Sequence, residues 1–171
     1  MPPEVKRLNH DWDAATATEQ LFSTYKGDVY RYARLTLNNP TAAEDIVQEV
    51  FIRVLRSWDR YRGDSTPRTW LWAIVRNCIT DYTRKHRRDR DHQLFEEQLG
   101  GQTDFHTSVS FEAEQLLKVL SRDQREVVIL RLIQDWSISD TARILQWSEA
   151  KVKTTLHRAV AKLREEGQRY G

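Results

Sequence analysis

The stretch SEAKVKTTLHRAVAKLR, residues 148–164, carries five Lys or Arg side chains and has apolar residues at helical spacing. The apolar positions recur every three or four residues and predict one inward face of a helix, made of Val152, Leu156, Ala159 and Leu163. The other positions are mostly basic or carry hydrogen-bonding groups. Those that we expect to face outward are Lys151, Lys153, Thr154, Thr155, His157, Arg158 and Lys162.

Two further helices are predicted just before this one. SRDQREVVILRLI, residues 121–133, has Ser121 as a candidate N-cap, and SDTARILQ, residues 139–146, is a shorter helix. The tight turn LQWS, residues 145–148, joins the short helix to the basic one. This order is typical of a helix-turn-helix motif, whose second helix enters the major groove of DNA. We therefore expect Lys and Arg on the outward face to contact phosphates, and the polar groups to contact base edges.

The composition allows one domain or two small ones, since 39% of the 171 residues are apolar and six are Trp. The net charge is only +2, but the charges are segregated along the chain. RKHRRDR, residues 84–90, is strongly basic, whereas residues 91–112 hold five acids and no Lys or Arg. This acidic segment contains adjacent glycines and lacks a sustained period, which predicts a flexible linker. The expected organisation is one domain over residues 1–90 and another over residues 113–171.

Several classes of protein are excluded by what the sequence lacks. No run of about 18 apolar residues is present, and the N-terminus lacks the apolar core of a secretory signal, so we expect a cytoplasmic protein without membrane insertion. Cys78 is the only cysteine, which excludes an internal disulfide, and we interpret it as a small buried side chain. The histidines lack metal-binding spacing and no glycine-rich phosphate loop is present. We therefore expect no cofactor, no metal site and no catalysis by this chain.

The N-terminal half also has helical periodicity, so the expected fold class is all-α, with two small helical domains joined by the linker. Thr41 is a candidate N-cap with Glu44 three residues later, as in a capping box. After it, a wide apolar stripe predicts a buried face made of Ile46, Val47, Val50, Phe51, Val54, Leu55 and Trp58. The opposite face is polar and holds Asp45, Gln48, Glu49, Arg53 and Arg56.

Another helix is predicted after the turn formed by Gly63, Asp64 and Ser65. Thr66 followed by Pro67 fits an N-cap with proline at the first helical position. The predicted core residues of this helix are Leu71, Ile74, Val75, Cys78 and Tyr82. A different side holds Trp72, Arg76, Thr80 and Thr83. That side suits nucleic acid because bases stack on aromatic rings while Arg binds phosphates, although a core or interface role for the tryptophan is an equal alternative.

With these motifs in view, the chain resembles the extracytoplasmic-function (ECF) sigma factors, the small two-domain group of the bacterial sigma family. The resemblance extends from about Leu21 to Arg164. The first domain matches in AEDIVQEVFIRVLRSWDRYRGDSTPRTWLWAIVRN, residues 43–77. The second matches in LSRDQREVVILRLIQDWSISDTARIL, residues 120–145, and VKTTLHRAVAKLR, residues 152–164. Two long motifs in the right order, separated by a variable linker, make this resemblance specific.

The resemblance implies that the chain binds core RNA polymerase and directs transcription from specific promoters, under the control of an anti-sigma factor. The first domain would bind the clamp helices of the beta-prime subunit through Asp45, Gln48, Glu49 and Arg53. It would also read and melt the -10 element of promoter DNA through Gly63, Asp64, Ser65, Trp72, Arg76, Asn77 and Thr80. The second domain would touch the beta flap and read the -35 element through Lys151, Lys153, Thr154, Thr155, His157 and Arg158.

The chain departs from the family pattern at two turns. Pro67 stands where the family often has an aromatic residue, which leaves the shape of the base pocket open. Gln146 replaces the usual glycine of the helix-turn-helix turn, so we expect another residue to adopt any left-handed conformation there, at a cost of about 1 kcal/mol. A stand-alone helix-turn-helix repressor is an alternative function, but it leaves the acidic face and RTWLWAIVRN, residues 68–77, without a task.

Overall fold

The computed structural model describes residues 11–87 and 110–170, and every regular element within these ranges is helical. The elements in chain order are α1 (Ala14–Leu37), α2 (Pro40–Ser57), the turn η1 (Trp58–Arg60), α3 (Pro67–Lys85), α4 (Phe111–Lys118), α5 (Arg122–Val128), the π-helical turn η2 (Ile129–Ile133), α6 (Ile138–Leu145) and α7 (Glu149–Tyr170). The expected all-α fold class is confirmed. Most of the expected linker, residues 91–109, lies outside the described ranges. Among the described helices, none combines the length and the apolar character that crossing a bilayer requires.

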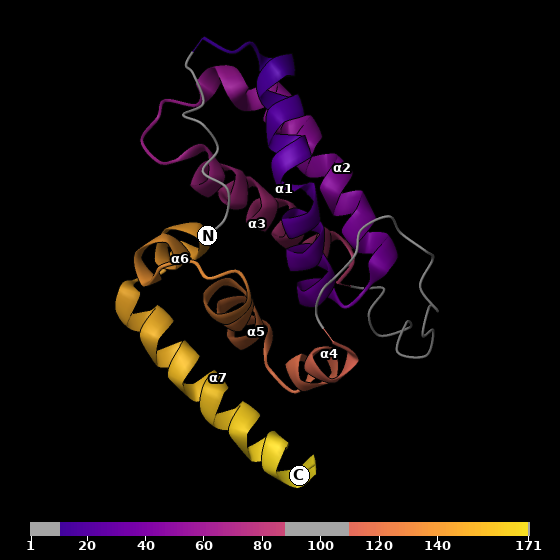
Figure 1. Cartoon of the computed structure of the whole chain (residues 1–171), viewed down its shortest axis with the longest axis vertical. Coiled ribbons are helices and arrows are strands. Elements are labelled where there is room, and N and C mark those ends of the chain that lie inside the picture. Colours follow the sequence, from indigo (N-terminus) through magenta and orange to yellow (C-terminus); the bar gives the residue numbers. More distant parts are fainter. Residues whose placement is uncertain (1–10, 88–109, 171) are drawn as a thin grey trace.

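Helices α1 to α3 form the N-terminal domain, in which α1 and α2 lie side by side (Figure 1). Thr66 caps α3 as expected, because its side chain accepts a hydrogen bond from the amide of Thr69 over 3.2 Å. The start of α2 differs from the expectation. Asn39 is the N-cap and Pro40 occupies the first turn, so the predicted cap at Thr41 is wrong. Proline suits the first helical position, where its missing N–H is not needed, and it moves the cap to the preceding residue.

The apolar stripe predicted on α2 is buried except at its edge. Ile46, Val50 and Val54 are at most 2% exposed and pack in the hydrophobic core. Leu55, which we expected in this stripe, is 47% exposed, and its neighbour Ile52 is 43% exposed. Each residue turns the helix by about 100°, so the position after Val54 points away from the face that the rest of the domain covers.

Helices α4 to α7 form the C-terminal domain. Ser121 and Gln124 form a capping box at the start of α5, which confirms the predicted N-cap. The helix widens to π geometry from Ile129 onward, and the amide of Gln134 bonds to the carbonyl of Ile129 over 2.9 Å. Such widened turns recur at functional positions of helices. Here the turn brings Gln134 to the boundary with the other domain, while Leu130 remains fully buried.

The turn of the helix-turn-helix motif is made by Gln146 itself, which has φ 58° and ψ 42°. The expectation that a different residue would take the left-handed conformation is therefore wrong. The conformation is required because the amide of Trp147 returns to the carbonyl of Ala142 over 2.9 Å and closes the end of α6. The side chain of Gln146 is exposed, so a non-glycine residue fits there without a steric clash.

The two domains pack against each other, with α1 next to α5 and η2, and α3 next to α6 (Figure 1). Arg125 of α5 donates to the carbonyl of Thr36 near the end of α1 over 3.1 Å. Arg34 of α1 pairs with Glu114 of α4, with 3.6 Å between guanidinium nitrogen and carboxylate oxygen. We call this packing the closed arrangement, and it covers part of the face of α3 that was expected to contact DNA.

Candidate nucleic-acid interfaces

The first candidate surface lies on α7. Ser148 caps this helix by accepting a hydrogen bond from the amide of Lys151 over 3.1 Å. Val152 and Ala159 are fully buried, which fixes the rotation of α7 about its axis. The six residues expected to read the -35 element therefore face outward, and each is exposed or half-buried: Lys151, Lys153, Thr154, Thr155, His157 and Arg158.

The basic side chains of this face differ in their surroundings. The ammonium of Lys151 lies 3.8 Å from the centroid of the Trp147 ring, a cation–π contact that holds this charge beside the turn. Lys153 and Arg158 are exposed further along α7. Their charges and the nearby hydroxyls point away from the domain, which is the arrangement that a major groove requires of a recognition helix.

The second candidate surface begins with the loop before α3, which rests on aromatic side chains. The rings of Tyr61 and Trp70 lie 5.1 Å apart. The Tyr61 hydroxyl donates to the carbonyl of Ser65, so the two ends of the loop are tied together. Gly63 has φ 79°, a left-handed conformation that favours glycine, and it is exposed together with Asp64. The sequence predicted the loop but not the aromatic support beneath it.

The α3 residues expected to read the -10 element divide into covered and exposed ones. Trp72 is fully buried, and its Nε1 donates to Oε1 of Gln134 in the C-terminal domain over 3.1 Å. In the closed arrangement it is thus an interface residue, which was the alternative left open above. Arg76 is half-buried at the same boundary. Asn77 is exposed, and the hydroxyl of Thr80 donates to the carbonyl of Arg76 over 2.9 Å.

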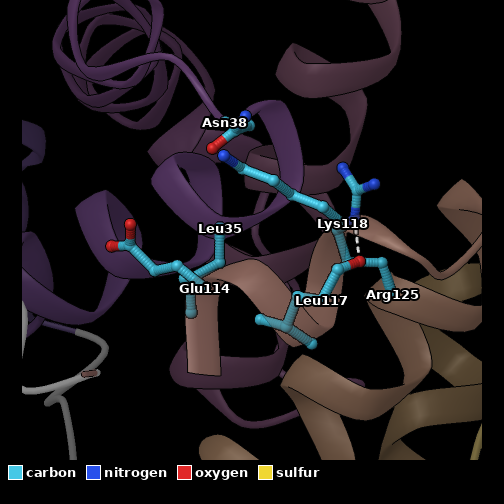
Figure 2. Close-up of a pocket in the computed structure, with 6 residues that line it drawn as sticks. All are labelled: Leu35, Asn38, Glu114, Leu117, Lys118 and Arg125. Carbon is cyan, nitrogen blue, oxygen red and sulfur yellow. Dashed lines mark hydrogen bonds between the residues drawn. The ribbon is translucent and has the colours of Figure 1, made fainter. Parts of the chain in front are cut away.

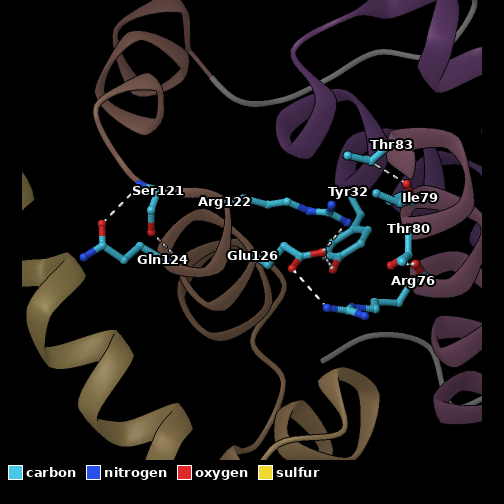
Figure 3. A network of polar contacts seen from close by, with 9 residues as sticks. All are labelled: Tyr32, Arg76, Ile79, Thr80, Thr83, Ser121, Arg122, Gln124 and Glu126. Atoms are coloured by element: carbon cyan, nitrogen blue, oxygen red, sulfur yellow. Dashed lines mark hydrogen bonds and ion pairs between the residues drawn. The ribbon is translucent and has the colours of Figure 1, made fainter. Parts of the chain in front are cut away.

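A buried carboxylate on α5 holds this boundary together (Figure 3). The Tyr32 hydroxyl donates to Glu126 over 3.3 Å, and Arg76 and Arg122 place guanidinium nitrogens 3.7 Å and 4.0 Å from its oxygens. The side chain of Glu126 is 0% exposed. Loss of hydration raises the pKa of Glu126 above its ordinary value, although both arginines and the tyrosine hydrogen bond lower it. The sequence placed this glutamate in a helix with Arg122 one turn earlier, but it gave no sign of the partners on α1 and α3.

The third candidate surface is the polar face of α2. Asp45 and Gln48 are exposed. Arg53 links two carboxylates, with 2.8 Å from its Nε to Glu49 and 2.9 Å from a terminal nitrogen to Asp81 on α3. The sequence analysis did not predict the pair with Asp81, since this partner on α3 is far away in the chain. The exposed side chains of Ile52 and Leu55 lie on the same helix and add apolar area that the sequence analysis did not assign to a surface.

A small pocket lies between the end of α1 and α4 (Figure 2). Arg125 lines it and donates to the carbonyls of Leu117 over 3.0 Å and Leu120 over 3.3 Å. Leu35 and Glu114 contribute further to its lining. Its residues come from both domains, so the pocket lies at the interface between the two domains in the closed arrangement.

Cys78 is buried in α3, as the sequence predicted. Burial raises the pKa of its thiol to about 12, and the nearby Arg53 only partly opposes this effect. The thiol is therefore protonated at neutral pH and is a packing group.

Comparisons with known proteins agree with the two-domain division. The family model described as Sigma-70 region 2 matches residues 21–89, and the model described as Sigma-70, region 4 matches residues 110–163. The ECF RNA polymerase sigma factor SigX of Bacillus subtilis is 38% identical over 160 residues, covering 85% of this chain and 80% of that protein. The RNA polymerase sigma factor YlaC of the same species is 31% identical, covering 86% and 90%.

The fold is also similar to a solved sigma factor. The structure of RpoE from Bartonella quintana, in complex with the anti-sigma factor NepR, matches with a TM-score of 0.73 and 25% sequence identity. The match covers 86% of this chain and 94% of that one. The chain belongs to the sigma-70 family and, within it, to the ECF sigma factors. It is a transcription initiation factor, and its two domains are regions 2 and 4 of that family.

Proposed function

We propose that this chain directs core RNA polymerase to promoters through three separate surfaces. The outward face of α7 reads the -35 element. The loop at Gly63 to Ser65, together with the exposed face of α3, reads and melts the -10 element. The polar face of α2, with Asp45 and Glu49, binds the clamp helices of the beta-prime subunit. The observation that carries the proposal is the recognition helix, whose basic side is exposed while Val152 and Ala159 fix its orientation.

The physical argument for melting is the cost of exposing a base. Extruding a base from a duplex costs a few kcal/mol, so the protein must supply stacking and polar contacts to the unpaired strand. Arg76 and Trp72 on α3 are groups of this kind. In the closed arrangement the C-terminal domain covers both, so this function requires the domains to move apart.

We propose also that an anti-sigma factor holds this chain inactive. The support is the similarity of the whole chain to the RpoE structure, which was solved with an anti-sigma factor bound. A partner that binds across both domains would stabilise the closed arrangement by mass action and keep α3 covered.

Transcription in vitro tests the proposed function. The purified chain is mixed with bacterial core polymerase and a library of promoter fragments, and the transcripts are sequenced. We expect transcripts with a shared pair of elements upstream of their start sites. Transcripts that do not depend on the added chain would refute the proposal, whereas specific binding to an operator without polymerase would favour a repressor.

A further inference from the structure

An aromatic side chain stands at the turn of the helix-turn-helix motif. Trp147 follows the left-handed Gln146, and its amide donates to the carbonyl of Ala142 over 2.9 Å. Its side chain is half-buried and packs against the hydrophobic core. The backbone hydrogen bond and this packing fix the ring beside the start of α7. The ring is therefore ordered before any DNA binds.

The ammonium of Lys151 lies 3.8 Å from the centroid of this ring. The contact is a close one, since cation–π contacts extend to about 6 Å and the contact of Lys26 with Phe22 has a distance of 5.2 Å. Lys153, two residues further along α7, is exposed and makes no such contact with a ring of the described residues. The same helix thus carries one lysine that a ring orders and one that no ring orders.

The stability of α7 does not explain a lysine at this position. Lys151 lies in the first turn, where the partial positive charge of the helix N-terminus disfavours a cation. Among the residues that the structure describes, no carboxylate forms an ion pair with it, whereas Arg53 pairs with two. An aromatic ring attracts an ammonium through its quadrupole but does not neutralise it. Lys151 is therefore ordered and keeps its full charge.

An ordered ammonium of this kind suits a phosphate group. It has three N–H donors, and the ring occupies only one side of it, so donors of the exposed Lys151 remain available. A compact point charge binds a phosphate oxygen without needing a planar partner. Immobilising a flexible side chain on binding costs free energy. The contact with Trp147 lowers this cost, because it orders the lysine in the unbound chain.

We propose that Trp147 is a positioning residue for DNA recognition, because its ring holds Lys151 in place for one phosphate of the -35 element. The proposal rests on the proposed function, in which the outward face of α7 binds this element. A phosphate contact at the first turn of α7 fixes the register of the helix on the duplex. Trp147 acts on affinity through Lys151 and needs no contact with DNA of its own.

The test is a double-mutant cycle with the full chain and a short fluorescein-labelled duplex, which carries the upstream element shared by the transcripts of the transcription assay. W147L keeps an apolar side chain but removes the ring, and K151A removes the charge. We expect W147L to lower the affinity about fivefold, because Lys151 must then be ordered on binding. K151A should lower the salt slope by about one, as the loss of one phosphate contact does. In the K151A background, W147L should have no further effect.

The matched control is K153A, because Lys153 carries the same charge without contacting the ring. W147L should lower the affinity by the same factor in the K153A background as in the wild type. W147F keeps a ring with a weaker attraction for cations, so its loss should be smaller than that of W147L. Circular dichroism checks folding. If W147L is unfolded, the cycle is run with tetrafluorotryptophan at position 147, which keeps the indole shape but weakens the negative face of the ring.

Equal losses from W147L with and without Lys151 would show that the ring only supports the turn, and would overturn the proposal. No loss in a folded W147L, or an unchanged salt slope in K151A, would overturn it as well. A wild-type chain that directs no specific transcription refutes the proposed function and this role of Trp147 with it. A chain that directs transcription, but in which the effects of W147L and K151A add, refutes only the positioning role.

Discussion

The outward face of α7 and the reading face of α3 differ in one respect that governs their use. Both offer basic and hydrogen-bonding side chains, but Lys153 and Arg158 are exposed while Trp72 is fully buried under the other domain. The first surface can meet duplex DNA in the closed arrangement, and the second cannot. If the two faces have the proposed roles, contact with the -35 element does not require the domains to separate, whereas reading the -10 element does.

The closed arrangement is built from contacts that can be broken. It relies on hydrogen bonds and ion pairs of Glu126, Arg125 and Gln134 around one aromatic contact. Interfaces between domains of one chain are commonly polar, and they permit relative motion. Water replaces such polar contacts at low net cost, because each is exchanged for a hydrogen bond to solvent. A partner that binds the open chain can therefore shift the equilibrium.

The largest expected effect concerns the polar face of α2, which is not part of the comparison between α7 and α3. Helix α2 lies across α1 from the C-terminal domain, so its polar face is accessible in both arrangements (Figure 1). The double variant D45K/E49K should lower the affinity for core polymerase about hundredfold or more, because like charges facing each other across an interface cost several kcal/mol. Binding is measured by fluorescence anisotropy with labelled chain, and circular dichroism should show unchanged helicity. The control is E165K, an exposed charge reversal on α7; equal affinity of D45K/E49K and E165K would remove α2 from the polymerase surface.

The next largest effect concerns α7 and tests whether its outward face binds -35 DNA. K153A and R158A should each weaken binding to -35 duplex DNA by roughly 1–3 kcal/mol if the side chain reads a base, or lower the salt slope by about one if it binds phosphate. R164A on the same helix, further from the turn, is the control. If R164A loses as much affinity as R158A, the binding is a general effect of charge.

A smaller, pH-dependent effect is expected at the boundary between the domains. Glu126 faces Tyr32 of α1, Arg76 of α3, and Arg122 and Asp123 of its own helix, and burial raises its pKa above the ordinary 4.5. A folded pKa above the unfolded one means that the folded chain binds the proton more tightly. The resulting stabilisation is present below pH 4.5 and is lost as the pH rises through the raised folded pKa.

The variant E126Q removes this titration while keeping the shape of the side chain and an oxygen that accepts from Tyr32. Urea unfolding at several pH values gives the free energy of unfolding for both chains. The difference, wild type minus E126Q, should fall as the pH rises from 4.5 toward neutrality. Other carboxylates, such as Asp13, whose hydrogen bonds with Thr16 lower its pKa, titrate alike in both chains and cancel. A difference that is flat or rises over this range would contradict the assignment.

The sequence predicted what depends on local pattern. Ser121 and Thr66 were identified as caps because their partners lie within three residues, and the buried stripe of α2 follows from helical spacing. Features that depend on contacts between distant segments of the chain could not be predicted from the sequence. The burial of Trp72 comes from Gln134, and two partners of Glu126 come from α1 and α3, so these contacts have no signal in the surrounding residues. Leu55 was misplaced because an apolar residue at the edge of a stripe fits either a core or an exposed binding face.

The smallest effect concerns the turn that orients α7. Gln146 adopts φ 58°, a left-handed conformation that costs an ordinary residue about 1 kcal/mol or more, and its exposed side chain contributes little packing. Q146G removes that strain but adds flexibility to the unfolded chain, so the net stabilisation should be about 0.5 kcal/mol. Thermal unfolding followed by circular dichroism measures it, and binding to -35 duplex DNA should not change. The control is N38G, because Asn38 has φ 52° at the end of α1 but asparagine tolerates this conformation, so its gain should be smaller. A lower stability of Q146G would show that the Gln146 side chain contributes a contact that outweighs its backbone strain.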